Sequence, residues 1–200
     1  YCPAHGHGAI VDALRREQYP KPFSLAFCLE DTVPEDAVEA AEQELLQNLE
    51  ALSRSRAEAD FYLPPIFIRV RSPRQLRKLA DACRPYAHLL RGFILPKFFL
   101  ENCGAYIQAI QDIAALCPHY QYMPIFESPA MRPLHTRYED LARVKEALEA
   151  VAGRILNIRV GGNDLSHAFG LRRSVRDTIC AVRPVADLLV DIVTTFSTQY

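Results

Sequence analysis

Charged residues accompany five short apolar segments of this sequence, each near the C-terminal end of its segment. The segments cover residues 23–29, 66–70, 92–95, 122–126 and 155–160, and the charged residues are Glu30, Asp31, Arg69, Arg71, Lys97, Glu127 and Asp164. The carboxyl ends of parallel strands lie along one rim of a sheet or barrel, where active sites are found. If the segments form neighbouring parallel strands, we expect these charged side chains to converge on one site.

Such a cluster predicts a site for a divalent cation. Charges are costly to bury singly, so carboxylates beside arginine and lysine are stable only when they are paired or joined by a cation. The four acids supply hard oxygen ligands and an excess of negative charge, which suits Mg²⁺ completed by water and substrate oxygens. Arg69 adds a planar pair of donors for a carboxylate or carbonyl oxygen of a substrate.

Each of these charges, taken alone, also has a structural explanation. A residue that follows a strand can cap the next helix or form an ion pair on the surface. Helix capping does not favour arginine or lysine at the start of a helix, however. The five segment ends taken together therefore favour a functional site.

The stretches between the apolar segments have the pattern of helices. Predicted helices cover residues 35–52, 72–83, 102–116 and 138–151, and residues 53–65 are interpreted as a long connection. Residues 177–193 predict either a helix interrupted at Pro184 or a helix followed by a strand over 188–193. Continuous apolar strands that alternate with helices indicate an α/β fold with a parallel sheet, closed as a barrel or open.

Composition narrows the class of protein. With 200 residues the chain can form one domain with a hydrophobic core, and its net charge of -1 argues against a general attraction to nucleic acid or anionic membranes. No apolar run is long enough to span a bilayer, and no glycine-rich phosphate loop follows a strand. None of the six cysteines forms a C-x-x-C pair, which is typical of reduced thiols in a cytoplasmic protein.

Five segments resemble, in order, signatures of the HpcH/HpaI aldolase and citrate lyase beta-subunit superfamily. They are Leu29-Glu30-Asp31-Thr32-Val33, Ile68-Arg69-Val70, Leu95-Pro96-Lys97, Ile125-Phe126-Glu127-Ser128-Pro129 and Gly162-Asn163-Asp164-Leu165. The matching signatures are L-E-D-A-V, V-R-V-N, L-P-K, I-E-T and G-x-x-D-L. Residues 1–4 are similar to the family's first strand and its turn, and the resemblance extends to about residue 171. It is strongest to the C–C bond lyase branch.

The resemblance implies a (β/α)8 TIM barrel that acts as a magnesium-dependent C–C bond lyase on a 2-oxo acid or related carboxylate. It implies that Glu127 and Asp164 hold Mg²⁺ and that Arg69 and the metal stabilise the enolate. Further catalytic or ordering groups would be Glu30, Asp31 and Lys97, with Lys97 as a supporting charge rather than a Schiff base. Gly162 and Asn163, which lead into Asp164, are predicted to contact the substrate.

The sequence departs from the family pattern in three places. A typical barrel takes about 250 residues, so we expect a single barrel domain over residues 1–200 that is incomplete at its C-terminus. Its last strands would be absent or reduced to residues 186–196. Residues 4–8 contain no arginine or lysine, which argues against coenzyme A. Arg71 stands where the family usually has a small polar residue, and we expect it either to bind an acidic group of the substrate or to pair with Glu30.

The alternative to a lyase is a non-catalytic binding or scaffold protein in a stress-response or biosynthetic complex. An incomplete barrel leaves sheet edges that another chain can cover. The resemblance also implies a homo-oligomer, because family barrels often complete their site with a neighbour's segment. A phosphate-handling enzyme that uses the same acids for Mg²⁺ is a third option, and the missing phosphate loop argues against it.

Overall fold

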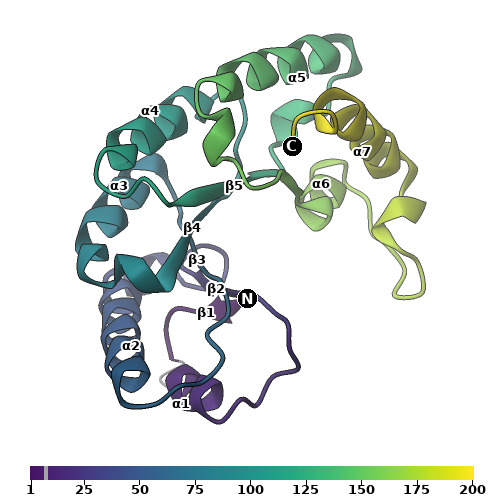
Figure 1. Cartoon of the computed structure of the whole chain (residues 1–200). Helices are drawn as coiled ribbons and strands as arrows, with labels where there is room; N and C mark the ends of the chain where they lie inside the picture. The colour runs from purple at the N-terminus through teal and green to yellow at the C-terminus, as the bar shows by residue number, and fades with distance from the viewer. Residues whose placement is uncertain (7–8) are drawn as a thin grey trace. The chain divides into compact units, whose positions relative to one another are not determined.

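The computed structural model describes residues 1–6 and 9–200, which fall into two compact α/β units. The N-terminal unit comprises Tyr1–Ile94 and Asp112–Gln121, and the C-terminal unit comprises Leu95–Gln111 and Tyr122–Tyr200. Figure 1 follows the chain from its purple N-terminus to its yellow C-terminus. His7 and Gly8, which belong to the stretch considered for coenzyme A, lie outside the described residues.

The N-terminal unit contains parallel strands that pair in chain order. They are β1 (Cys2–Pro3), β2 (Leu25–Cys28), β3 (Ile66–Arg69) and β4 (Leu90–Leu95), of which Leu95 belongs to the other unit. Cys28 lies beside Arg69, and the Leu29 N–H donates to the Arg69 carbonyl at 3.0 Å. This register places the segment that starts at Glu30 next to the end of β3, as the parallel arrangement predicts.

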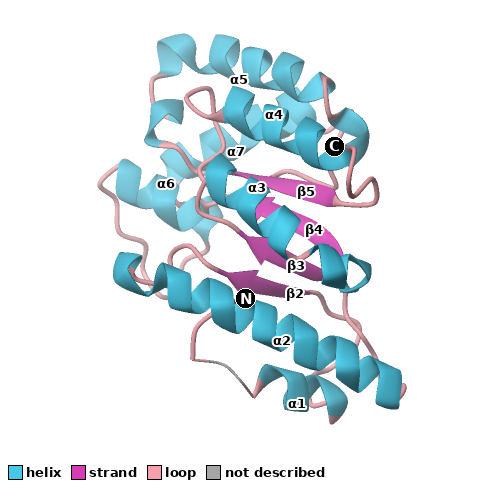
Figure 2. Ribbon diagram, turned by 90° about the vertical axis from the view of Figure 1, so that its left-hand side faces the viewer, coloured by secondary structure: helices cyan, strands magenta, loops and turns pink. Residues whose placement is uncertain are grey.

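Three helices belong to the N-terminal unit, and Figure 2 shows two of them, α1 and α2, side by side. They are α1 (Ile10–Arg15), α2 (Val38–Glu58) and α3 (Pro73–Ala82), with 3-10 turns η1 (Glu35–Ala37) and η2 (Arg84–Leu89). Helix α1 was not predicted. Helix α3 begins as predicted, because the Ser72 hydroxyl accepts the N–H of Gln75 at 3.2 Å and Pro73 occupies the first turn.

Helix α2 buries a stripe of residues and extends beyond its predicted end. Ala41, Leu45, Leu49 and Leu52 are almost fully buried at the spacing of one helical face. The predicted connection over residues 53–65 is wrong for residues 53–58, where no glycine or proline interrupts the helix.

The C-terminal unit contains two paired parallel strands, β5 (Gln121–Phe126, in this unit from Tyr122) and β6 (Arg159–Val160). Phe126 pairs with Val160, and this register sets the ends of the two strands side by side. The predicted strand over 155–160 is mostly irregular: Ile155 makes a single bridge to Tyr122, and the chain pairs again only at its last two residues.

The helices of the C-terminal unit are α4 (Cys103–Ala114, in this unit to Gln111), α5 (Leu134–Glu149), α6 (Gly162–Ala168) and α7 (Arg183–Phe196). Short 3-10 turns η3 (Pro129–Met131), η4 (Ala152–Arg154) and η5 (Ile179–Ala181) connect them. Pro184 lies in the first turn of α7, where a proline is tolerated, and Val185, Leu188 and Ile192 form its buried stripe. From Arg183 onward the ambiguous segment is therefore one helix, with Pro184 in its first turn rather than at an interruption. Within the described part of the chain, no strand follows β6.

A buried ion pair joins α5 to α7, which pack together (Figure 1). Arg137 is 2% exposed, and its Nη1 donates to Oδ2 of Asp191 at 2.9 Å. The other donors of the guanidinium bind the carbonyl oxygens of Met131 and Arg132, each at 2.9 Å. The Tyr138 hydroxyl donates to Oδ1 of Asp191 at 2.8 Å, and this bond raises the pKa of Tyr138. The charges of the pair are therefore well satisfied.

The six cysteines are free thiols, as the sequence predicts, and all but Cys180 are buried. Burial raises the pKa of Cys83 to about 12. Among the helices that the structure describes, none has the length and apolar character needed to cross a membrane.

Candidate active site

In the N-terminal unit, Arg69 lies between two of the predicted acids. Its Nη2 atom is 2.6 Å from Oε2 of Glu30 and 2.9 Å from Oδ2 of Asp31. The side chains of Arg69 and Glu30 are about nine-tenths buried, whereas that of Asp31 is half exposed. The Tyr1 ring lies 5.7 Å from the guanidinium carbon of Arg69, a cation–π distance. Three predicted site residues are thus brought together.

The burial of this cluster separates the roles of its two acids. Glu30 is buried against the guanidinium and also accepts the Asp31 N–H at 3.0 Å, so it keeps Arg69 oriented. Asp31 is open to solvent, so a substrate carboxylate could displace it from the guanidinium at little cost. One cation and two carboxylates leave the cluster with a formal charge of -1.

Arg71 holds the loop that carries these acids. Its Nη1 donates to the carbonyl oxygens of Leu29, Glu30 and Val33 at 3.1, 3.1 and 2.9 Å. Its Nη2 pairs with the Glu35 carboxylate. Of the two expectations for Arg71, the contact with Glu30 is made to the main chain, and binding of a substrate group stays a prediction.

In the C-terminal unit, Glu127 follows β5 and is 4% exposed. Its Oε1 accepts the main-chain N–H of Lys97 at 3.1 Å. Its Oε2 lies against Gly161, where an added Cβ atom would come within 2.1 Å of that oxygen. Gly161 follows β6 and donates its N–H to the Phe126 carbonyl at 3.1 Å. The missing side chain of Gly161 therefore leaves the space that the buried carboxylate occupies.

Asp164 lies three residues beyond Gly161, in the first turn of α6. It is partly exposed, and its carboxylate has no hydrogen-bond or ion-pair partner among the residues that the structure describes. Asn163 is exposed beside it. Gly162 packs against Ile179, since a Cβ atom here would lie 2.6 Å from Cγ1 of that residue. Substrate contacts of Gly162 and Asn163 stay predictions.

The donor chemistry of Glu127 and Asp164 fits Mg²⁺. Both are carboxylates, the oxygen ligands that this ion prefers, and they follow paired strands of one unit. The residues at 1–6 and 9–200 contain no group of three or more His, Cys, Asp or Glu that could hold a metal. A Mg²⁺ ion held by the two acids would take its remaining ligands from water and substrate, as this ion commonly does.

Lys97 contributes to this region through its main chain. Its backbone is left-handed, with φ of 51°, and its side chain is exposed. The Asn102 side chain donates to the Lys97 carbonyl at 2.9 Å and accepts the Phe99 N–H at 3.1 Å. Asn102 and Gly161 were not predicted as site residues. An asparagine at the first residue of a predicted helix, here the helix over 102–116, is a turn and capping signal that indicates such a role for Asn102.

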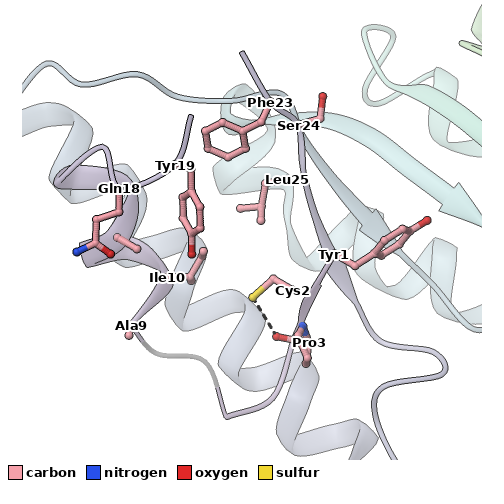
Figure 3. Close-up of a pocket in the computed structure, with 11 residues that line it drawn as sticks. Tyr1, Cys2, Pro3, Ala9, Ile10, Gln18, Tyr19, Phe23, Ser24 and Leu25 are labelled. Atoms are coloured by element: carbon pink, nitrogen blue, oxygen red, sulfur yellow. Dashed lines mark hydrogen bonds between the residues drawn. The ribbon is translucent and has the colours of Figure 1, made fainter. Parts of the chain in front are cut away.

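A pocket of about 480 Å³ lies between α1 and the strands β1 and β2 (Figure 3). Its lining is mainly apolar and includes Ile10, Tyr19, Phe23 and Leu25, together with the thiol of Cys2. Burial raises the pKa of that thiol. None of the predicted site residues is among the described residues that line this pocket.

Comparisons with known proteins identify a family and a fold. The model of a family described as "C-C Bond Lyase of the TIM-Barrel fold" matches residues 1–200. Among solved structures, the crystal structure of RipC from Yersinia pestis is similar, with a TM-score of 0.57 and 14% sequence identity. The alignment covers 98% of this chain and 69% of the RipC chain, and at this identity the likeness concerns the fold alone. No curated protein matches the chain.

Proposed function

Because the chain belongs to the family of C–C bond lyases of the TIM-barrel fold, we propose that it is a magnesium-dependent lyase that cleaves or forms a C–C bond in a 2-oxo acid or related carboxylate. The observation that supports this most is the environment of Glu127. Glu127 is a buried carboxylate that accepts the main-chain N–H of Lys97 and occupies space that the glycine at position 161 leaves, and the carboxylate of Asp164 follows that glycine by three residues. Buried charges are stable when they are hydrogen-bonded, paired or joined by a metal ion.

In this proposal Glu127 and Asp164 hold Mg²⁺, which as a Lewis acid would polarise a substrate oxygen. The N–H of Lys97 fixes one carboxylate oxygen of Glu127, and the absence of a side chain at Gly161 leaves room for the other. Asp164 has no competing ion pair among the described residues, so its carboxylate needs no rearrangement before it binds a cation. These features support a site that is ordered before the ion arrives.

Arg69 would bind the substrate's negative charge, which grows on oxygen as the C–C bond breaks. Glu30 orients the guanidinium from a buried position, and the exposed Asp31 is the group that a substrate carboxylate would displace. The assignment of Arg69 and of the two proposed metal ligands, Glu127 and Asp164, to one reaction comes from the order of the sequence signatures. The superfamily named from those signatures stays a prediction.

We expect Glu127→Gln and Asp164→Asn each to weaken Mg²⁺ binding by at least about tenfold, because each change removes a charged oxygen ligand of the ion. Isothermal titration calorimetry with MgCl₂ measures this. Glu146→Gln, an exposed acid on α5, is the matched control and should bind as the unaltered protein does. Equal affinity in all four proteins would refute the metal assignment.

We expect Arg69→Ala to reduce turnover by about 100-fold or more, the usual effect of removing a donor that stabilises developing charge. The assay is metal-dependent cleavage or condensation over a panel of 2-oxo acids, with and without EDTA. Arg77→Ala is the control, because Arg77 forms an exposed ion pair with Asp112 in the same unit. A panel in which no carboxylate reacts with Mg²⁺ present would reject the lyase and favour the binding or scaffold protein.

A further inference from the structure

The turn between β4 and α4 contains a strained residue at the candidate metal site. Lys97 has a φ of 51°, a left-handed conformation that residues with a Cβ atom rarely adopt. Such conformations persist where the surrounding structure enforces them, often at functional sites.

Two hydrogen bonds of one side chain span this turn. Nδ2 of Asn102 donates to the Lys97 carbonyl, and Oδ1 of Asn102 accepts the N–H of Phe99. The amide therefore spans the turn and holds both of its sides. In this conformation the Lys97 N–H points to Oε1 of Glu127, at 3.1 Å.

The same turn is anchored to the chain on both sides of Glu127. The Phe98 N–H donates to the Ile125 carbonyl at 2.9 Å, and the Phe98 ring stacks on that of Phe126, with 6.2 Å between centroids. After Glu127, the Ser128 hydroxyl donates to the carboxylate of Glu101. A shift of the turn would therefore be transmitted directly to Glu127.

We propose that Asn102 is a positioning residue for Glu127: it holds Lys97 in its left-handed conformation, and the N–H of Lys97 then fixes the carboxylate. Where it concerns Mg²⁺, the inference rests on the proposed function. In this role Lys97 acts through its main-chain N–H and not through its side-chain amine. A glycine at position 97 would adopt the same backbone conformation without the hydrogen bonds of Asn102. A glycine there should therefore restore what is lost when Asn102 is replaced.

The experiment compares Asn102→Ala with the double variant Asn102→Ala/Lys97→Gly. Calorimetry with MgCl₂ should show about tenfold weaker binding for the single variant and recovery of most of the affinity in the double variant. A purely structural loss at position 102 would not be reversed by a glycine five residues away. Asn157→Ala, an exposed loop asparagine of the same unit, is the control. Unchanged affinity in Asn102→Ala, or no recovery in the double variant, would overturn the inference.

A second measurement needs no metal. Hydrogen exchange of the residue 97 amide, measured in EDTA, should be faster in Asn102→Ala and slow again in the double variant. If the unaltered protein binds no Mg²⁺, the proposed function fails, yet faster exchange still supports the positioning role and unchanged exchange overturns it. Should Asn102→Ala not fold, Asn102→Asp takes its place, because it keeps the acceptor for Phe99 and loses the donor to Lys97.

Discussion

Replacing Gly161 with alanine should weaken Mg²⁺ binding by about 10- to 100-fold, as changes that displace a ligating group commonly do. The added Cβ atom would lie 2.1 Å from Oε2 and 2.6 Å from Cβ of Glu127, so the carboxylate has to move. It cannot turn away freely, because the residue is buried and its other oxygen is bound to Lys97. Titration calorimetry gives the affinity, and circular dichroism verifies that the variant is folded.

Gly104→Ala is the control for this change. Gly104 lies in α4 of the same unit, and a Cβ atom there meets nothing within 4 Å. This variant should bind Mg²⁺ normally and gain about 0.5–1 kcal/mol of stability, because alanine is the better helix former. If Gly161→Ala binds Mg²⁺ as tightly as Gly104→Ala does, Glu127 is not a ligand in its present position.

Replacing Arg137 with alanine should lower the free energy of unfolding by about 3–5 kcal/mol, the usual cost of breaking a buried ion pair. The change would leave the Asp191 carboxylate buried without its guanidinium, and the carbonyl oxygens of Met131 and Arg132 would lose their donors. Urea denaturation followed by circular dichroism measures the loss.

Two further variants identify the cause of that loss. Arg137→Leu/Asp191→Leu removes both charges and should be more stable than Arg137→Ala, because an apolar pair of similar volume is often tolerated. Arg143→Ala removes an exposed arginine of α5 whose partner Asp140 is 4.0 Å away, and we expect a change below about 1 kcal/mol. A loss in Arg137→Ala as small as that of Arg143→Ala would contradict the role of the pair.

The strands were the most predictable part of the fold. The apolar segments that became β2, β3, β4 and β5 are short and largely buried, and their pattern predicted each strand to within two residues at either end. Segment 155–160 was predicted as a full strand, but only its ends pair. Apolar content alone does not distinguish a buried strand residue from one such as Leu156, which is 40% exposed.

Helix ends were less predictable, because local and tertiary effects compete there. Helix α2 continues past its predicted end to Glu58 and buries Ser55 there, and the sequence neighbours of Ser55 do not indicate this burial. Pro184 was compatible with either an interruption or a start, and the packing of α7 on α5 favours a start. The short helices α1 and α6 lack a periodic pattern long enough to predict them.

Part of the candidate site followed from register alone. Neighbouring parallel strands bring the residues after them together, so the contact of Arg69 with Glu30 and Asp31 could be predicted. The requirement for glycine at position 161 could not be predicted, because it depends on the rotamer of Glu127, which follows the neighbouring strand. The hydrogen bonds of Arg71 to three carbonyl oxygens could not be predicted either, because an arginine after a strand does not indicate which carbonyl oxygens it will contact.

The hydrogen bonds of Arg71 restrict the motion of the loop that they hold. With three carbonyl oxygens and Glu35 bound to one guanidinium, the backbone from Leu29 to Val33 loses its conformational entropy during folding rather than when a ligand arrives. Charged groups on such a rigid loop require little reorganisation energy when a reaction shifts charge beside them. Any gate that opens and closes during turnover therefore has to be formed by another segment.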